Sequence, residues 1–432
     1  MSKFSRQLSG TTPRWATYYT LSNPPSAPRL TSLPTILSQP AYTLGSELGK
    51  AATLQAIQGA LYTLELTGLK FVIEASRRLA LEPATMCDIL RYASARSAPS
   101  MIKHDTSHRS GELEEMEHKL SDFASLGEEL GSPTPVTRCA LAAVKRWRED
   151  GTGYHSSAVV GSPTVWDFSS SSEPTRPPLE RRQRVLVVGL GVMGLGMALS
   201  LAKSFDVTGC DVSAERLAEA QAHALSTTDD VGSCLEETDF LLFVVEKFEQ
   251  IMGILDKAAA ALASRTRPLT LIAHSTMSPS SAMVVRDRIS ELNNSLSFLE
   301  APISGGPARA MRGELLIITA GDRAVVDAAM PVFEHLASRL YYAGEVGNAS
   351  KMKALHQISA AINHISSFEV LCAGVKCGFG AEFLYEILVK YAYNQYLADR
   401  IPKLLSRDFT PDARLSIWLK DLVNLPVCVC IG

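Results

Sequence analysis

Residues 185–202 read VLVVGLGVMGLGMALSLA, and this stretch decides how the second half of the chain is organised. It sets Gly189, Gly191 and Gly194 directly after an apolar strand pattern and at the opening of a helical one. In that context the first glycine permits a tight turn, the second lets a pyrophosphate approach the backbone, and the third lets helix and strand pack closely. The N-terminus of the following helix faces the anion. The stretch therefore predicts a strand, turn and helix that bind a dinucleotide.

Asp211 ends the next strand pattern, 22 residues after Gly189. A carboxylate at this place accepts hydrogen bonds from the ribose hydroxyls of the adenosine and repels a 2′-phosphate. Arg216, the residue that would favour a phosphate, stands a helical turn further on. We therefore predict NAD rather than NADP as the cofactor. The alternative is that Asp211 is a turn residue that caps the helix SAERLAEA, 213–220.

From residue 184 onward, short apolar runs of strand type alternate with helical stretches. The strand-type runs are RVLVVGL, VTGCD, FLLFVV, LTLIAHS, LSFLEAPIS and LLIITAG. Alternation of this kind gives right-handed crossovers and a mostly parallel sheet. After about residue 344 only long helical stretches remain. We therefore predict an α/β Rossmann domain over 184–343, followed by an all-α domain over 344–432.

The first part of the chain has a different pattern. Residues 41–160 show helical spacing in AATLQAIQGALYTLELTGLKFVIEASRRLAL, ELEEMEHKLSDFASLGEEL and TPVTRCALAAVKRWRED, which predicts a second all-α domain. A Ser/Pro-rich segment over 161–183 indicates a linker. Residues 1–40 are basic and Pro-rich without an amphipathic period, which indicates a disordered tail on a cytoplasmic protein. The alternative is an organellar transit peptide and a mitochondrial location.

The overall composition excludes several classes of partner. Forty-two basic and 45 acidic residues give a formal charge of −3, which offers no bulk attraction to nucleic acid or to an anionic membrane. No apolar run reaches the roughly 18–20 residues that span a bilayer. The eight cysteines are scattered, and Cys428 and Cys430 lack a second pair at metal-site spacing. We therefore expect reduced thiols and no metal.

Two further stretches carry polar groups that suit a small acid. LEAPISGGPARAMRG, 299–313, ends a strand in Ser304, Gly305 and Gly306. Consecutive small residues with free N–H groups form an anion-binding concavity, which suits a carboxylate; the alternative is an ordinary Gly-rich turn.

The second stretch is GNASKMKALHQ, 347–357, at the start of a helix. One stripe of this helix carries Lys353, His356, Gln357, Ala360 and His364, whereas Lys351 points about 200° away, towards the stripe of Leu355, Ile358 and Ile362. The apolar stripe is expected to meet the core, and the polar stripe to line a cleft. The alternative is a solvated helix face.

Four motifs in this order over 184–422 resemble the β-hydroxyacid dehydrogenases, the family of 3-hydroxyisobutyrate and 6-phosphogluconate dehydrogenases, and within it the L-threonate dehydrogenase branch. The motifs are GLGVMG, STMSP at 275–279, EAPISGG, and G-x-x-x-x-x-K-x-x-H-Q ending at Gln357. The resemblance implies an NAD-dependent oxidation of a small hydroxy acid, such as threonate or 3-hydroxyisobutyrate, and a homo-oligomer. The alternative is a catalytically impaired NAD-binding remnant or scaffold.

The resemblance also implies a role for each matching residue. Lys353 corresponds to the catalytic general acid/base. A lysine suits this role, because hydride leaves the carbinol carbon for nicotinamide C4 as the hydroxyl proton leaves for a base. The positions implied for the substrate carboxylate and chain are Ser304, Gly305, Gly306, His356 and Gln357. The positions implied for the cofactor are the glycine loop with Val192 and Met193, then Ser275, Thr276 and Lys420.

An internal repeat links the two helical parts. Without gaps, SELGKAATLQAIQG (46–59) falls on GEVGNASKMKALHQ (344–357), and the triplet at 88–90 falls on that at 386–388. The first part then resembles a second copy of the C-terminal helical domain. Gln55 stands at the position of Lys353 and, after one residue of drift, Ser121 stands at that of Lys420, so we predict that this copy is inactive.

The end of the chain departs from the resemblance. The chain stops at NLPVCVCIG, soon after KDL, where relatives have further helices. It therefore resembles a fragment of the tandem-dehydrogenase fusion proteins of plants and fungi, with a truncated C-terminal domain. We expect the N-terminal copy to dock on the C-terminal one and to cover the surface left bare.

Overall fold

The structure is a computed structural model of the 432-residue chain. It describes residues 17–19, 41–43, 49–93, 95–101, 111–150, 163–169, 182–410 and 419. These residues form two compact units. The helical unit contains the described residues of Met1–Ala75, Leu90–Val160 and Ile358–Asp412, and the sheet unit contains those of Ser76–Ile89, Gly161–Gln357 and Ala413–Gly432.

The main sheet of the sheet unit has six parallel strands in the order β6-β5-β4-β7-β8-β9. They are β4 (Arg184–Val188), β5 (Asp206–Cys210), β6 (Ser226–Thr228), β7 (Phe240–Phe243), β8 (Leu269–Ala273) and β9 (Leu296–Glu300). This order confirms the predicted Rossmann domain. Sequence order reverses between β4 and β7, and ligands of such sheets bind at the carboxyl ends of the strands beside that reversal.

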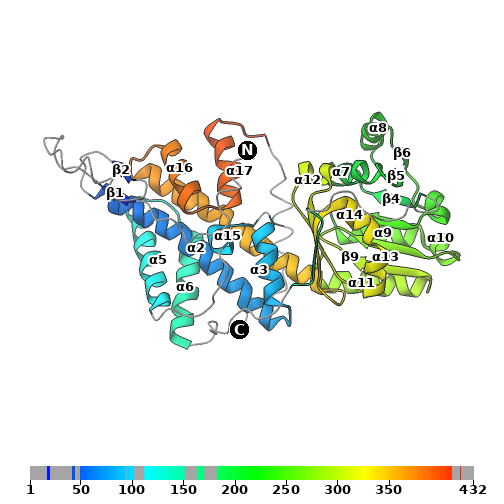
Figure 1. Cartoon of the computed structure of the whole chain (residues 1–432), viewed down its shortest axis with the longest axis horizontal. Coiled ribbons are helices and arrows are strands. Elements are labelled where there is room, and N and C mark those ends of the chain that lie inside the picture. The colour runs from blue at the N-terminus through cyan, green and yellow to red at the C-terminus, as the bar shows by residue number, and fades with distance from the viewer. Residues whose placement is uncertain are drawn as a thin grey trace. The chain divides into compact units, whose positions relative to one another are not determined.

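Helices cover both faces of this sheet (Figure 1). Val185 and Val187 of β4 face one core with α7 (Val192–Leu201) and α8 (Ala214–Ala222), whereas Leu186 and Val188 face the other. The second core is completed by α9 (Phe248–Lys257), α10 (Ala259–Ala263) and α11 (Pro279–Leu292). Because alternate residues of a strand point to opposite faces, a run as apolar as VLVV fits a strand buried on both sides.

A second, four-stranded sheet has the order β10-β11-β12-β3. It is built from β10 (Ile303–Ser304), β11 (Leu315–Thr319), β12 (Ala337–Tyr342) and β3 (Val165–Asp167), and α12 (Pro307–Arg312), α13 (Arg323–Ala328) and α14 (Met330–Leu336) lie between its strands in sequence. Two predictions are corrected here. LLIITAG lies in this sheet and not in the main one, and the expected linker supplies β3, which pairs with β12.

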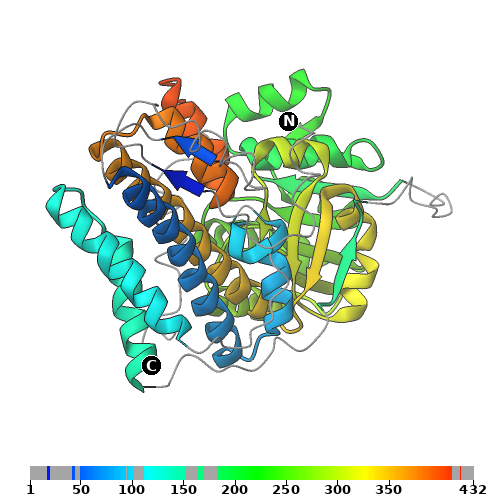
Figure 2. The ribbon, with the colours of Figure 1, turned by 60° about the vertical axis from the view of Figure 1, so that its left-hand side comes forward.

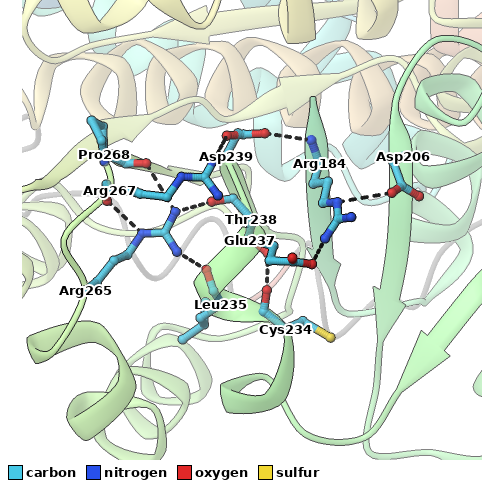
Figure 3. Close-up of polar contacts among 10 residues, drawn as sticks. All are labelled: Arg184, Asp206, Cys234, Leu235, Glu237, Thr238, Asp239, Arg265, Arg267 and Pro268. Atoms are coloured by element: carbon cyan, nitrogen blue, oxygen red, sulfur yellow. Dashed lines mark hydrogen bonds and ion pairs between the residues drawn. The ribbon is translucent and has the colours of Figure 1, made fainter. Parts of the chain in front are cut away.

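At their amino ends the main strands are joined by polar contacts (Figure 3). The guanidinium of Arg265 is buried and donates to the carbonyls of Arg267, at 2.9 Å, and of Leu235, Thr238 and Pro268. Asp239 accepts from the backbone of Arg184, at 2.9 Å, and from Arg267, at 3.2 Å. These contacts fix the edge of the sheet opposite to the carboxyl ends.

The helical unit joins both helical parts of the sequence. Its elements lie in α2 (Lys50–Arg78), α3 (Pro83–Tyr92), α4 (Ala98–Met101), α5 (Glu112–Glu129), α6 (Pro135–Asp150), α15 (Asn348–Lys376), α16 (Ala381–Tyr391) and α17 (Gln395–Leu405); the end of α2, most of α3 and the start of α15 belong to the sheet unit. The three helical stretches predicted before residue 160 are confirmed as α2, α5 and α6.

One apolar core runs through both helical parts. Leu54, Ile57 and Phe123 are fully buried in a single cluster with Val370 and Leu384. Figure 2 shows α2, in blue, running alongside α15, in orange. The two helical segments that the sequence analysis treats as separate domains therefore pack as one unit, and the expected docking of the first on the second is observed.

Two features of the helical part differ from expectation. Within the expected tail, Thr17–Tyr19 forms β1, which pairs in parallel with β2 (Ala41–Thr43), while residues 1–16 and 20–40 lie outside the described residues. Among the described residues, α15 is the one helix long and apolar enough to cross a membrane, with a mean hydropathy of 1.3 over 18 residues. Of that window, 61% is buried inside the protein.

Candidate active site

The carboxyl ends of five strands are aligned across the main sheet. In the register of the strands, Cys210 pairs with Val188, Val188 with Phe243, Phe243 with Ala273, and Ala273 with Glu300. The residues that follow these five positions therefore lie along one edge. They include most of the residues that the sequence analysis assigned to the cofactor.

The glycine loop has the backbone shape that its sequence predicts. Gly189 has φ +97°, and a Cβ there would lie 2.5 Å from the carbonyl oxygen of Val244. A Cβ on Gly194 would lie 1.8 Å from the carbonyl oxygen of Gly189, so turn and helix are in direct contact. A Cβ on Gly191 would meet nothing within 4 Å. The open side of the loop is thus at Gly191, where a pyrophosphate would approach.

The residues next to this loop divide between cofactor side and core. Val192 is 59% exposed at the first turn of α7, whereas Met193 packs against the core under the sheet. Val212, directly after Asp211, is 91% exposed. An exposed apolar side chain beside the ribose position offers a surface to a flat base.

Asp211 is already hydrogen-bonded within its own turn. Its Oδ2 accepts from the backbone N–H of Leu190 at 2.7 Å, and its Oδ1 accepts from that of Ser213 at 2.9 Å. The helix α8 is capped by Ser213, whose Oγ accepts from the N–H of Arg216. The alternative, that Asp211 is a turn residue that caps this helix, is thus partly right. Asp211 orders the turn, but the residue that caps the helix is Ser213. Each carboxylate oxygen keeps acceptor capacity for a ribose hydroxyl.

Ser275 and Thr276 follow β8. Ser275 is buried, and its Oγ donates to the carbonyl of Val245 at 2.6 Å, which ties the ends of β7 and β8 together. Thr276 is partly buried beside it. The hydroxyl of Ser275 is therefore engaged by the protein, and of the pair Thr276 is the more accessible to a cofactor.

Ser304 and the start of α15 meet in a buried polar cluster. The Oγ of Ser304 lies 3.5 Å from Nε2 of His356, and Nδ1 of His356 lies 3.1 Å from Oε1 of Gln357. Burial and the nearby charge of Lys353 hold the pKa of His356 well below its usual value, while the contact with Gln357 opposes this. A neutral ring with Nδ1–H donating to Gln357 leaves Nε2 as the acceptor facing Ser304.

Lys353 is buried, with 5% of its surface exposed, so the alternative of a solvated helix face is wrong. Lys351 is half-buried, and its Nζ donates to Oδ1 of Asn348 at 3.0 Å. The two lysines therefore have different environments, but the stripe predicted to meet the core is the less buried one, because Ile358 and Ile362 on it are half-buried like Lys351. Ala360 and His364, expected on the same stripe, belong to the helical unit.

The glycines that follow Ser304 form an open loop. Gly305 and Gly306 have φ of +142° and +77°, and a Cβ on Gly306 would meet nothing within 4 Å, so the loop is open at that point. Lys420 lies outside the described residues. Within the described ranges, no group of three or more His, Cys, Asp or Glu side chains is placed to hold a metal.

Comparisons with known proteins agree with this arrangement. Residues 184–344 match the NAD binding domain of 6-phosphogluconate dehydrogenase, and residues 347–425 match the NAD-binding domain of NADP-dependent 3-hydroxyisobutyrate dehydrogenase. The chain is 32% identical over 242 residues to L-threonate dehydrogenase of Cupriavidus necator, covering 55% of this chain and 80% of that protein. The chain belongs to the β-hydroxyacid dehydrogenase family. Residues 184–344 are accordingly an NAD-binding domain.

Other members of this family are similar over the same region. L-threonate dehydrogenase of Escherichia coli is 27% identical over 241 residues, covering 55% of this chain and 79% of that protein. The solved 3-hydroxyisobutyrate dehydrogenase from Salmonella typhimurium is 25% identical with a TM-score of 0.52, covering 56% of this chain and 85% of that one. The family models extend over residues 184–344 and 347–425, so the family likeness covers the Rossmann domain and most of the chain after it.

Two buried residues of this family member were missed by the sequence analysis. Glu300 is fully buried at the end of β9, and its Oε1 accepts from the N–H groups of Gly347, at 2.5 Å, and Ala349, at 2.9 Å. Its Oε2 accepts from Oγ of Ser350 at 2.7 Å. The carboxylate thus holds the N-terminus of α15, the helix that carries Lys353. An acid at the first position of EAPISGG was the available signal.

His274 is the second missed residue. It is buried between β8 and Ser275, and its Nδ1 lies 2.8 Å from the carbonyl of Ala301. Burial lowers its pKa to about 4, so the ring is neutral and Nδ1 donates. Within the described part of the chain, Nε2 has no hydrogen-bond partner. The residue joins the ends of β8 and β9 beside the site.

Proposed function

We propose that the chain is an NAD-dependent dehydrogenase of a small hydroxy acid and that Lys353 is its general acid/base. The observation that supports this most is the burial of Lys353 one turn before His356, which faces Ser304. A buried ammonium loses hydration, which favours the neutral amine that a base requires. The pairing of Lys351 with Asn348 gives that lysine no such environment.

The chemistry follows from these positions. NAD supplies the hydride acceptor, C4 of the nicotinamide. As the carbinol C–H bond breaks and its hydride leaves, Nζ of Lys353 takes the hydroxyl proton, and a carbonyl forms; the reverse direction returns the same proton. Because the pKa of His356 is depressed, the imidazole stays neutral and does not compete for this proton. Ser304 and the N–H groups of Gly305 and Gly306 would hold the substrate carboxylate.

We further propose a four-carbon sugar acid, with threonate as the first candidate, in preference to 3-hydroxyisobutyrate. His356 and Gln357 place an imidazole and an amide on the same buried face as Lys353. Such polar groups pair with the extra hydroxyls of a sugar acid and lose their partners against an apolar analogue. The relatives from Cupriavidus necator and Escherichia coli carry the name L-threonate dehydrogenase, which supports the same choice.

NAD is proposed over NADP on account of Asp211. Its carboxylate would repel a 2′-phosphate. The guanidinium of Arg216 is engaged by Glu219 on the same helix, at 2.8 Å. A cation that serves its own helix is not positioned to offset the charge of Asp211.

The test is the initial rate of NADH formation by the full chain with L-threonate, D-threonate, D-erythronate and 3-hydroxyisobutyrate. We expect turnover of one four-carbon acid, with 3-hydroxyisobutyrate poorer. Gln357→Leu should lower kcat/KM for the sugar acid at least tenfold and change that for 3-hydroxyisobutyrate less. A folded protein that binds NAD but oxidises none of the four acids would favour the alternative, an NAD-binding remnant or scaffold.

A further inference from the structure

We propose that the helical unit is a two-fold pair of homologous helical domains within one chain, in which α2–α4 take the place of a second subunit against α15–α17. The inference concerns how the chain assembles and stands apart from its catalytic function. It is carried by the spacing of the elements, by the point where the two long helices are in contact, and by two sets of buried polar contacts.

The elements of the two halves repeat at an almost constant spacing. α2 and α15 both have 29 residues, and both ends of α15 come 298 positions after those of α2. α16 begins 298 positions after α3, and α17 begins 297 positions after α4. This is the register in which residues 46–59 align with 344–357, so sequence and element bounds agree independently.

The two long helices are in contact where Gly68 of α2 faces Ile362 of α15. A Cβ on Gly68 would lie 3.6 Å from Cβ of Ile362 and 3.1 Å from its Cδ1. The spacing of 298 makes Ser366 the equivalent of Gly68, and Leu64 the equivalent of Ile362. Leu64 and Ser366 are both 0% exposed. A two-fold pair requires both of these equivalent positions to be buried, because Gly68 and Ile362 contact each other, and they are.

Buried polar side chains repeat the same relation. Asn363 and Glu65 are equivalent positions, and each reaches the segment that precedes the last helix of the other half. Nδ2 of Asn363 donates to the carbonyl of Ala95 at 2.7 Å, and Glu65 accepts from Nδ2 of Asn394 at 2.7 Å. The three polar residues, Asn363, Glu65 and Asn394, are each at most 1% exposed, and Ala95 is fully buried.

The backbone joins the halves in the same way. Ser97 and Asn394 form an isolated antiparallel bridge. The N–H of Ala98 donates to the carbonyl of Tyr393 at 2.6 Å, and the N–H of Gln395 donates to that of Arg96 at 2.9 Å. At a spacing of 297, Gln395 is the equivalent of Ala98 and Tyr393 is the equivalent of Arg96, so the two hydrogen bonds are equivalent to each other. The pseudo-two-fold axis therefore passes through this bridge.

The first half then serves as a partner without catalytic groups. Gln55 stands at the position of Lys353. The helix α6, which comes after the first half in the chain, is held by Glu369 of α15, which accepts from the N–H of Val136 and from Oγ1 of Thr137, both at 2.6 Å. The contribution of the first half is to bury the apolar face of α15 and to satisfy the polar groups on it. A second chain is not required at that face.

A disulfide tests whether the pairing occurs within one chain. The separation of 3.6 Å between the Cβ positions lies in the range of about 3.5–4.5 Å that disulfides require. In the full-length double variant Gly68→Cys/Ile362→Cys, mild oxidation should link these two positions within a monomer, as read by non-reducing electrophoresis and peptide mapping. The control is Gly68→Cys/Ile365→Cys, because Ile365 is 42% exposed, and it should not cross-link. A linked dimer, or two free thiols at 68 and 362 in the folded variant, would overturn the proposal.

A second variant keeps the proposal testable if the cysteine pair fails to fold. Asn394→Ala removes the side chain that bonds Glu65 and Ser367, both in the buried network. In the native full chain, hydrogen exchange of α2 and of α15 beyond residue 357 should accelerate together and by a similar factor. Faster exchange in α2 alone, with α15 unchanged, would show that the halves are independent and would overturn the pairing.

Discussion

Replacement of Glu300 is the perturbation that bears most directly on how the site is positioned. The carboxylate is fully buried and accepts from Gly347, Ala349 and Ser350 at the start of α15. Glu300→Ala leaves these donors without an acceptor in the interior. Glu300→Gln is the matched control, because its carbonyl oxygen still serves the two backbone N–H groups and its NH2 can donate to Oγ of Ser350.

The magnitudes separate the two variants. Each buried donor left unsatisfied costs about 1–3 kcal/mol, so with three donors Glu300→Ala should lower the free energy of unfolding by about 3 kcal/mol or more. In Glu300→Gln the lost charge-assisted bonds are offset by the relief of burying a carboxylate, and we expect a loss of about 1 kcal/mol or less. Because Lys353 follows one turn after Ser350, kcat/KM should fall at least tenfold in the alanine variant.

The difference in stability between wild type and Glu300→Gln should depend on pH, and its sign follows from the pKa of Glu300. Burial raises the pKa of Glu300, and the hydrogen bonds from Ser350 and the backbone only partly oppose this. The folded state therefore binds more protons than the unfolded state above about pH 4.5, and stability falls as pH rises through the raised folded-state pKa. Wild type should lose stability relative to Glu300→Gln across that window.

Urea unfolding at several pH values measures both effects. Equal stability of Glu300→Ala and wild type, or a wild type that gains stability over Glu300→Gln as pH rises in this window, would refute the reasoning. The m-value should stay unchanged, because both variants keep the same folded surface.

Three further outcomes are expected. In wild type, the free energy of unfolding should fall by up to about 3 kcal/mol between pH 6.5 and pH 4, because the pKa of His274 is lowered to about 4 and the folded state therefore resists protonation. His274→Gln should remove this pH dependence. Urea unfolding at the two pH values checks this, and an equal loss in both proteins would contradict it. In the same assay, Arg265→Met should lower the free energy of unfolding by about 2–4 kcal/mol, because four carbonyls lose their donor. Arg267→Met loses only a half-exposed ion pair and should lower it by about 1 kcal/mol or less. Equal losses in the two variants would argue against the buried network. Asp211→Asn should reduce the preference for NAD over NADP in kcat/KM at least tenfold, and an unchanged ratio would remove Asp211 from cofactor selection.

The sequence predicted the main sheet well, because its signals are local. VLVVGLG needs a buried parallel strand and a turn with positive φ, and both are present at Val185–Gly189. The run LLIIT was as apolar as its neighbours, and no local pattern distinguishes a strand of the main sheet from one of the second sheet. The placement of β3 was equally hidden, because VWD gains its strand structure from pairing with β12.

The site was predicted in its residues but not in its supports. The helical spacing separated Lys353 from Lys351, but it predicted that the stripe of Lys351 meets the core, whereas Lys351 is half-buried and Lys353 is the more buried of the two. Glu300 and His274 were missed because their partners, at Gly347 and Ala301, are distant in sequence and are brought close only by the sheet. Likewise, the repeat indicated two helical copies, but their shared core depends on contacts such as that of Phe123 with the C-terminal helices.

The most direct test of the account compares Lys353→Ala with Lys351→Ala in NADH formation from the best four-carbon acid. We expect Lys353→Ala to lower kcat by about 10²–10⁴-fold, the range of a general acid/base, while NAD binding is retained. Lys351→Ala should stay within about threefold of wild type, because that lysine serves Asn348 at the helix start. Near-normal turnover by a folded Lys353→Ala protein would contradict the assignment of the lysine and the mechanism built on it.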